Sequence, residues 1–468
     1  MPLESCRHER GHIVDSRFFG NGYGTDESRR IFCDVCRFQR WLEVEAVLAL
    51  SQGELELIPQ AAADEIAAAA DVSGLDLERV RTEIGRTGHS LVGLLACVRQ
   101  ACGPEAGRYL HVGATTQDIE DTGQCLEMRD VLDELDRLLT PLVADLAQLA
   151  EAHASDAALG RTHAQPALPM GFGLKVAGWI DEVLRDAQRL GQMRRRVLVA
   201  QLFGGVGTMA GFGGQGPELI QVFARRLGLE VPRVGWHTAR DRVAEYVCAL
   251  AMMAGTLGRI ADEVRTLSRP EFGELELPWR PGMVGSSTMP HKRNPEACEQ
   301  VVALARLAAA QVAPALAAMA GDHERDGRTL RLEWACVPDV SHYTLAAAAT
   351  LQHVIGGLAV HRDRLLANVR AVSDQVCTER LMLLLAAEIG AQPAYTWVYD
   401  RSQDARSRGL SLKEELLREG SVLQHLSATH LEAVFEPSGY LGDSARLVEG
   451  VVDEARQWLK ERTAWKAA

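Results

Sequence analysis

The sequence predicts an all-α fold with long helices, and three observations support this prediction. Alanine and leucine abound, whereas aromatic residues make up 5% of the 468 residues, a mix that favours helix over sheet. From residue 125 to about residue 154, apolar side chains recur at steps of three and four, which is typical of one broad helix face. Further long helical patterns cover about 170–200, 243–268, 296–319 and 340–369.

The order of these patterns predicts three helical domains. Residues 1–113 contain a polar leader and several short helices, and residues 114–369 contain the long helices, which we expect to form a central bundle. Residues 370–468 are expected to form a small helical C-terminal domain. Pro141 lies inside the first long helix and predicts a kink there.

Charge and composition argue against several classes of protein. The net charge of −13 gives a nucleic-acid partner no electrostatic support. No signal peptide or membrane span is evident, and residues 1–30 are polar with mixed charges, so we expect no membrane association. Most of the ten cysteines are scattered through helical patterns, as expected of reduced thiols in a cytoplasmic protein.

One cysteine pair raises the question of a metal. Cys33 and Cys36 have the spacing of a zinc-ligand pair, and Cys6, His8 and His12 precede them. No second pair with a familiar ligand spacing follows, and Cys33 falls where a helix is expected to start. We therefore expect no metal and no cofactor.

The loop at 281–295 carries the most chemistry. It ends in Gly-Ser-Ser-Thr-Met-Pro-His-Lys-Arg-Asn-Pro, and its prolines and glycines predict a mobile loop before a helix that starts after Pro295. The Ser286 hydroxyl, beside backbone donors and a cation, is suited to act as a base. Lys292 and Asn294 are suited to hold a carboxylate as negative charge grows on it. The alternative is a surface loop that only connects two helices.

Two more polar blocks and one glycine-rich stretch precede this loop. Gly-Ala-Thr-Thr-Gln-Asp-Ile-Glu-Asp-Thr at 113–122 is, taken alone, an ordinary start of a helix. Gly-Arg-Thr-His-Ala-Gln-Pro at 160–166 is expected to be a loop, because a glycine and prolines mark it. The glycines of 201–216 suggest a nucleotide-binding loop, but no βαβ pattern surrounds them, so a tight connection between helices is favoured.

Together the three blocks resemble the signatures of the fumarase/aspartase superfamily. Gly-Ser-Ser-x-Met-Pro-x-Lys-x-Asn-Pro is similar to its signature loop, and the blocks at 113–122 and 160–166 resemble its carboxylate-binding and Thr-His blocks. Trp-His-Thr-Ala-Arg-Asp-Arg at 236–242 is similar to carboxymuconate cycloisomerases, and His-Glu-Arg-Asp at 323–326 to adenylosuccinate lyases. The resemblance covers roughly 31–369 and implies a homotetramer with a 20-helix core, whose sites are shared between subunits.

The resemblance also implies roles for individual residues. Ser286 would be the base, although Ser287 stands next to it; Lys292 and Asn294 would stabilise the carbanion, and His163 would assist departure of the leaving group. The other positions implied or suited to bind substrate are Thr115, Thr116, Gln117, Thr162, Gln165, His89, Ser287, Met289, Arg240, Arg325 and Arg331. Arginine suits a second carboxylate, whereas arginines exposed on a connecting turn are the alternative for Arg325 and Arg331.

The activity that this resemblance implies is anti β-elimination from a substituted succinate, a small dicarboxylate, with cleavage of a C–N bond and release of fumarate. Adenylosuccinate lyases carry a further histidine where this chain has Pro166, so their proton donor to the leaving group is missing here. That difference favours a specialised reaction with a leaving group as unusual as nitrite from nitrosuccinate. The alternatives are a carboxymuconate cycloisomerase and a non-catalytic structural relative, and the intact Ser286, Lys292 and Asn294 argue against the latter.

Overall fold

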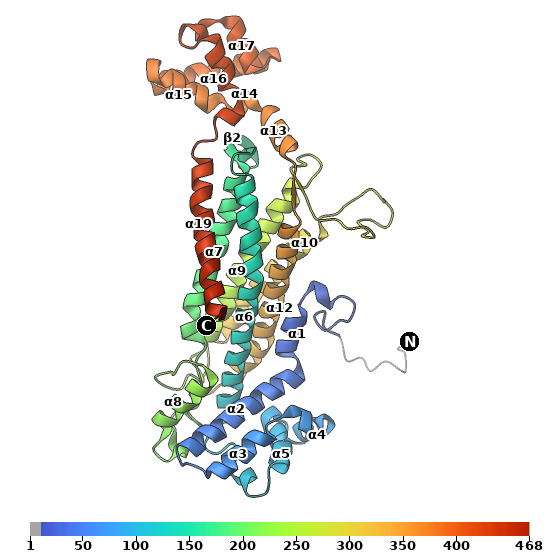
Figure 1. The fold of residues 1–468 in the computed structure, drawn as a ribbon, viewed down its shortest axis with the longest axis vertical. Helices are drawn as coiled ribbons and strands as arrows, with labels where there is room; N and C mark the ends of the chain where they lie inside the picture. Colours follow the sequence, from blue (N-terminus) through green and yellow to red (C-terminus); the bar gives the residue numbers. More distant parts are fainter. Residues whose placement is uncertain (1–10, 468) are drawn as a thin grey trace. The chain divides into compact units, whose positions relative to one another are not determined.

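The structure is a computed structural model that describes residues 11–467, with side chains through residue 462. Its regular structure is almost entirely helical (Figure 1), which confirms the predicted all-α class. Within these residues the strands form two small antiparallel sheets of two strands each. The chain divides into two compact units that are interleaved in sequence, so the predicted division at residues 113 and 369 stays a prediction.

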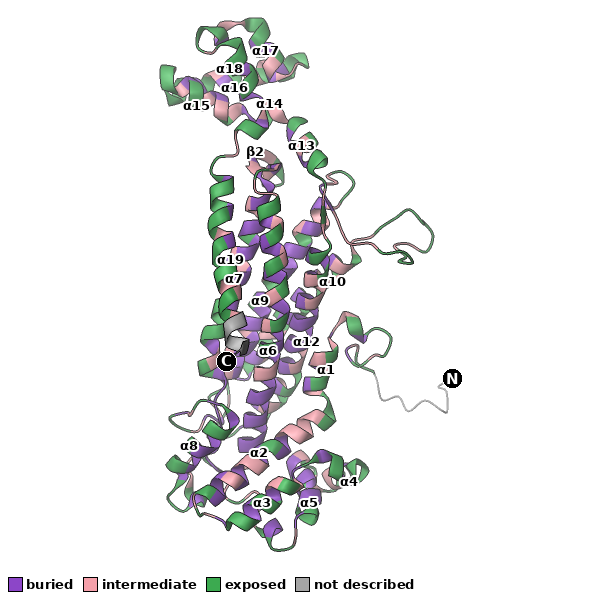
Figure 2. Cartoon of the chain, viewed as in Figure 1, coloured by how far each residue is buried: buried purple, intermediate pink, exposed green. Residues whose placement is uncertain are grey.

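Four long helices carry a large share of the buried apolar residues, and each has residues in both units. Buried positions run along α6, α9 and α12 in Figure 2. The apolar stripe predicted near 125–154 is buried in α6, as Leu135, Leu139 and Leu146 show. Pro141 lies inside this helix, and the kink expected there stays a prediction. The four helices are α6 (Thr116–Ala152), α7 (Phe172–Val197), α9 (Asp241–Leu267) and α12 (Gly327–Gly356).

Unit 1 comprises Met1–Leu139, Arg185–Arg259 and Gln300–Thr350. In it, α2 packs against α3 and α8, and α4 packs against α5. Local signals start these helices: Thr25 and Ser28 form a capping box at α1, and Asp76 caps α4. The shorter helices are α1 (Asp26–Phe32), α2 (Asp34–Glu54), α3 (Gln60–Ala69), α4 (Leu77–Thr87), α5 (Ser90–Ala101) and α8 (Gly216–Leu227).

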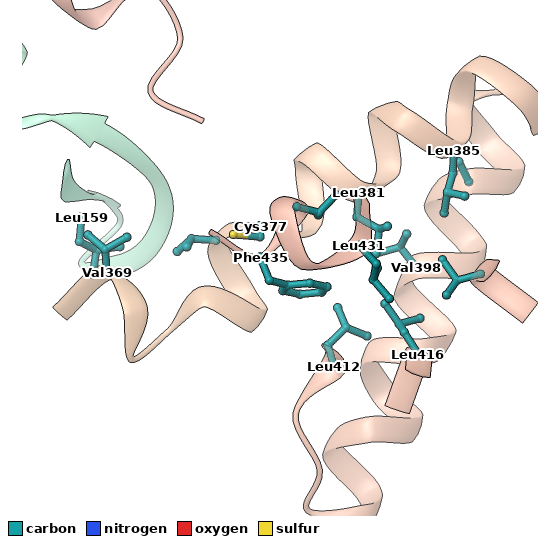
Figure 3. Packing of buried hydrophobic residues seen from close by; sticks show 14 residues of the cluster. Leu159, Val369, Cys377, Leu381, Leu385, Val398, Leu412, Leu416, Leu431 and Phe435 are labelled. Carbon is teal, nitrogen blue, oxygen red and sulfur yellow. The ribbon is translucent and has the colours of Figure 1, made fainter. Parts of the chain in front are cut away.

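Unit 2 comprises Thr140–Leu184, Ile260–Glu299 and Leu351–Ala468. Its C-terminal helices enclose an apolar cluster, in which Leu381, Leu416, Leu431 and Phe435 meet (Figure 3). These helices are α13 (Arg362–Arg370), α14 (Ser373–Val376), α15 (Thr378–Ile389), α16 (Ala391–Arg408), α17 (Leu412–Glu419) and α18 (Ala428–Val434). The last helix, α19 (Ser444–Ala467), contributes none of its described side chains to this cluster. The second sheet pairs β3 (Leu275–Glu276) with β4 (Ala359–Val360).

The block predicted as a loop at 160–166 lies in a β-hairpin, so that prediction was wrong. Strand β1 (Ala157–Thr162) pairs with β2 (Gln165–Gly171), and Thr162 faces Gln165 across the turn. The two turn residues, His163 and Ala164, have φ of 51° and 61°, the left-handed conformation that tight hairpins need. The prolines that suggested a loop are tolerated because a two-stranded sheet consists only of edge strands.

Two helical stretches, Asp241–Leu267 and Glu296–Ala317, are long and apolar enough to cross a membrane. The first is α9, whose most apolar part is 61% buried, as in the core helix of a globular unit. The second comprises α10 (Glu296–Ala310) and α11 (Val312–Ala317) and is 28% buried. It therefore exposes an apolar surface, while the expected absence of a membrane partner stays a prediction.

Candidate active site

The start of α6 presents the predicted Thr115–Thr116 turn. The Thr115 N–H donates to Asp118 Oδ2 at 2.9 Å, and the Thr115 hydroxyl oxygen accepts from Arg325 Nη1 at 2.7 Å. Gly113, with φ of 80°, comes so close to the Phe212 ring that a Cβ there would clash. The structure thus brings Thr115 and Arg325 together through a hydrogen bond.

The Asp118 carboxylate holds the turn at Thr115 in place. It is fully buried and accepts hydrogen bonds from the N–H groups of Phe203 at 3.0 Å and Gly204 at 2.9 Å. His237 Nε2 lies 2.9 Å from Asp118 Oδ1. Several donors compensate the burial of one carboxylate, as the low local dielectric requires. The glycine-rich stretch 201–216, which leads from α7 to α8, is thereby tied to the turn at Thr115.

Arg240 lies in a buried ionic network. Its guanidinium donates to both oxygens of Asp121, at 2.8 and 2.9 Å, and to both oxygens of Glu333, with Nε 2.8 Å from Oε1. It also lies over the Trp236 ring, 4.9 Å from its centroid. Burial disfavours the charged guanidinium, but the two carboxylates more than compensate, so the pKa of Arg240 is raised. This geometry suits a positioning residue better than the substrate contact that the sequence suggested.

Gln117 is buried beside this network. Its side-chain amide donates to Asp121 Oδ2 at 3.1 Å and to the backbone oxygen of His237 at 2.8 Å. Its amide oxygen is buried without a hydrogen-bond partner among the described residues. Such an unpaired acceptor is costly unless a further donor reaches it.

A pocket of about 350 Å³ brings together two more predicted residues, His89 and Arg331. Glu120 of α6 and Trp334 of α12 also line it. The Ser90 hydroxyl donates to Glu120 Oε1 at 3.1 Å. Burial raises the pKa of Glu120 and this hydrogen bond lowers it, but burial has the larger effect and the pKa rises to about 7. The pocket therefore holds a carboxyl group that titrates near neutral pH.

In unit 2, the signature loop is irregular and ends at Glu296, where α10 begins. The Ser286 hydroxyl oxygen accepts from the N–H groups of Thr288 at 3.4 Å and Met289 at 3.1 Å. Asn294 Nδ2 donates to the backbone oxygen of Gly285 at 2.6 Å and closes the loop upon itself. Ser286 is half-buried, whereas Ser287, Met289 and Lys292 are exposed, so these side chains point away from the unit's core.

Ion pairs and a cation–π contact hold the C-terminal end of this loop. Arg293 pairs with Glu276 at 2.5 Å and lies over the Trp279 ring, 5.1 Å from its centroid. Glu276 also lies 3.3 Å from His361 Nε2. These contacts hold the end of the loop while its tip remains exposed.

The hairpin presents Thr162, His163 and Gln165 on its exposed turn. Arg161 anchors the turn by donating to Glu274, with Nη2 2.6 Å from Oε1, and Glu274 also accepts from Asn368 at 2.8 Å. The hairpin therefore holds His163 on a short turn with a fixed base.

The predicted site residues thus form two groups. Unit 1 holds His89, Thr115, Thr116, Gln117, Arg240, Arg325 and Arg331, and unit 2 holds Thr162, His163, Gln165, Ser286, Ser287, Met289, Lys292 and Asn294. A site that combines the two groups stays a prediction.

The possible zinc ligands are only partly described. Cys6 and His8 lie outside the described residues, and Cys33 caps α2 by accepting from the Cys36 N–H at 3.4 Å. Within residues 11–467, no three histidine, cysteine or acidic side chains are placed to share a metal ion.

The family model described as "Lyase" matches residues 22–313, and the model "Adenylosuccinate lyase C-terminus" matches residues 374–451. The chain belongs to the fumarase/aspartase superfamily. It is a lyase of the branch that includes adenylosuccinate lyase and 3-carboxy-cis,cis-muconate cycloisomerase.

Relatives and solved structures in this superfamily match almost the whole chain. An N-acetyl-S-(2-succino)cysteine lyase of Dickeya dadantii is 37% identical over 94% of this chain and 97% of its own. An adenylosuccinate lyase of Methanothermobacter thermautotrophicus is 35% identical over 93% and 98%. The crystal structure of a fumarate lyase from Mesorhizobium sp. BNC1 covers 92% of this chain and 98% of its own, with a TM-score of 0.86 at 34% identity.

Sequence reasoning did not single out one histidine of this superfamily member. His111 precedes the 113–122 block, has φ of 65°, and places Nδ1 2.6 Å from Glu45 Oε1. Burial alone lowers its pKa, but the hydrogen bond and charge of Glu45 outweigh burial, and the net shift is upward. The only available signal was its position two residues before Gly113.

Proposed function

We propose that this lyase catalyses anti β-elimination from a 2-substituted succinate and releases fumarate. The observation that carries the proposal is the pair of N–H groups, from Thr288 and Met289, that donate to the Ser286 hydroxyl oxygen. Backbone donors aimed at an oxygen stabilise negative charge on it. Ser286 is thereby suited to lose its proton and to act as the base.

In the first step Ser286 takes a proton from the carbon next to a carboxylate. The electron pair left behind delocalises into that carboxylate, which becomes a dianion, and Lys292 supplies a positive charge to it. Asn294 contributes by closing the loop through Gly285, which keeps the loop's N–H groups in place. Charge stabilisation at this step lowers the barrier most, because the charge is absent from the ground state.

The substrate carboxylates would be held by hydroxyls of both polar blocks. Thr115 accepts a hydrogen bond from Arg325 and therefore keeps its own hydroxyl proton free to donate to a carboxylate. We propose the same role for Thr116 and for Thr162 on the hairpin. The remaining predicted contacts, Gln117, Gln165, His89, Ser287, Met289 and Arg331, stay part of this proposal.

His163 would assist departure of the leaving group from its place on the hairpin turn. We propose a nitrogen leaving group, in line with the adenylosuccinate lyases of 34% to 35% identity. A sulfur leaving group is the second candidate, because two relatives of 37% and 34% identity are named N-acetyl-S-(2-succino)cysteine lyase. Thiolate and nitrite need little proton assistance, which suits a chain with Pro166 in place of the further histidine.

We also propose that the enzyme is a cytoplasmic homotetramer with sites shared between subunits. The stretch Glu296–Ala317 and the residues after it expose apolar side chains: Leu316 is 51% and Met319 46% exposed. A continuous apolar helix surface favours burial against another protein surface. Packing against other copies of this chain would cover it.

An intramolecular addition is the alternative reaction. A 3-carboxy-cis,cis-muconate cycloisomerase of Bradyrhizobium diazoefficiens is 34% identical over 90% of this chain, and the stretch 236–242 resembles such cycloisomerases. This reaction uses the same kind of base and carbanion but releases no fumarate.

The test compares Ser286→Ala with Ser287→Ala, using release of fumarate from aspartate-type, thiol-type and nitro-substituted succinates. Removal of a general base lowers the rate by about 10² to 10⁴, so we expect the rate of Ser286→Ala to fall by this factor. Ser287→Ala removes a proposed substrate contact but not the base, so it should raise KM and keep kcat within about 10-fold of the parent. Equal activities of Ser286→Ala and the parent enzyme would refute the proposed base.

A further inference from the structure

Glu120 lies on the same face of α6 as the substrate-binding turn. Thr116 and Glu120 are four residues apart in one helix, so their side chains are neighbours on its surface. Glu120 lines the 350 Å³ pocket, whose other walls come from the start of α5 and from α12. A substrate held at Thr116 therefore has a carboxyl group and an open volume one helical turn away.

The surroundings of Glu120 differ from those of the other carboxylates on α6. Asp121 is paired with Arg240, and Glu127 is paired with Arg37 at 2.8 Å. Glu120 instead receives a neutral hydroxyl donor, Ser90, although its side chain is only 7% exposed. Buried carboxylates are normally paired with a cation, so this arrangement favours the protonated form.

The charged and titratable groups around Glu120 come from four helices. The charge of Asp121 on α6 raises the pKa of Glu120, and the more distant Arg37 on α2 lowers it. His89 at the start of α5 and Arg331 on α12 line the same pocket. With the pKa raised to about 7, the protonated form of Glu120 is accessible at neutral pH.

We propose that Glu120 is the acid that protonates the leaving group, and that the pocket beside it is the leaving-group subsite. The inference rests on the proposed elimination. As the C–X bond breaks, its electron pair goes to X, and the Glu120 O–H donates its proton to X. The products are fumarate, HX and the Glu120 carboxylate. Glu120 then regains a proton from solvent, and Ser286 releases to solvent the proton that it took from carbon.

This assignment fills the gap left by Pro166. An amine is a poor leaving group unless it is protonated, and a carboxylic acid with a pKa near 7 is matched to that task at neutral pH. Trp334 and Leu330 give the subsite apolar walls, and Arg331 gives it a positive charge. The chemical class expected there is an amine of modest size, and His163 would assist its departure by orienting it.

The test is Glu120→Gln, which removes the proton but keeps the shape of the side chain. Each enzyme is given a succinate with an amine leaving group and one with a thiolate or nitrite leaving group, and fumarate release is followed across pH. We expect the rate of fumarate release to fall by about 10² to 10³ with the amine leaving group and by less than about 10-fold with the weakly basic one. The parent's fall in kcat/KM above about pH 7 should disappear in the variant with the amine substrate.

Ser90→Ala provides a readout that a merely structural role would not change. The Ser90 hydroxyl lowers the pKa of Glu120, so its removal should move the upper limb of the pH profile to higher pH while the enzyme stays active. This variant also keeps the inference testable if Glu120→Gln does not fold. The matched control is Glu134→Gln, because Glu134 lies on the same helix and pairs with the exposed Arg137 outside the pocket.

The outcomes separate the two proposals. If Glu120→Gln lost equal activity with both leaving groups, or if Ser90→Ala left the pH profile unchanged, the role of Glu120 would be overturned. The proposed elimination would not be affected. A parent enzyme that releases fumarate from none of the succinates would overturn the elimination itself and the role of Glu120 with it.

Discussion

Arg240 and Asp121 form a double hydrogen-bonded ion pair, with distances of 2.8 and 2.9 Å, in which both side chains are buried. The pair joins the start of α9 to the first turns of α6, and Glu333 of α12 completes it. Because Asp121 follows Asp118 by three residues, the network supports the helix end that presents Thr115. A positioning role for Arg240 follows from this relationship.

Arg240→Ala should lower the free energy of unfolding by about 3 to 5 kcal/mol, because Asp121 and Glu333 would be left as uncompensated buried charges. Chemical denaturation monitored by circular dichroism measures this loss. Arg196→Ala is the matched control, since Arg196 pairs with Glu245 near the surface and should contribute less than about 1 kcal/mol. Similar losses in the two variants would contradict a stabilising role for the buried network.

Gly285→Ala should impair catalysis without unfolding the protein. A Cβ at this position would meet the backbone oxygen of Lys292, so the closure of the loop by Asn294 would have to open. Displacing catalytic groups by about 1 Å costs on the order of 10²-fold in rate. Fumarate release and the thermal midpoint are measured together. Unchanged activity would show that the loop closure is not needed.

Acid should destabilise the protein through His342. Burial and the charge of Arg29 lower its pKa to about 4, whereas the unfolded chain has the ordinary value of 6.5. Below pH 6.5 the unfolded state therefore binds a proton that the folded state does not, and stability falls until about pH 4. The shift corresponds to roughly 3 kcal/mol.

Denaturant unfolding of the parent and of His342→Gln between about pH 7 and about pH 4 measures this contribution. Glutamine can accept the hydrogen bond that the Ser28 hydroxyl shares with His342 Nδ1, at 2.8 Å in the parent, but it does not titrate. The stability of the variant should depend less on pH. Identical pH dependences in both proteins would exclude His342 as the source.

The helices were predictable because their signals are local. The period of apolar residues located α6 and α9, and Pro295 with Glu296 located the start of α10. The hairpin at β1 and β2 was missed, because glycine and proline mark a loop and a tight edge hairpin equally well. Its turn at His163 and Ala164 carries no glycine, the usual signal for left-handed backbone.

Of the candidate site, only the residues that lie in sequence motifs could be predicted. The motifs predicted Ser286, Thr115 and His163, but several of the groups that fix the turn at Thr115 are distant in sequence. Asp118 and His237 are 119 positions apart, and Arg325 reaches Thr115 across 210 positions. The buried setting of Glu120 depends on the placement of Ser90 and of α12, which no local pattern encodes.

The reverse reaction tests the central claim most directly. Fumarate is incubated with amines, thiols and nitrite, with the parent enzyme and with Ser286→Ala, and the products are identified by mass spectrometry. We predict a 2-substituted succinate with the parent enzyme, formed at least about 10²-fold more slowly by Ser286→Ala. No adduct from any of these nucleophiles, together with lactone formation from a carboxymuconate, would contradict the elimination and establish the intramolecular addition instead.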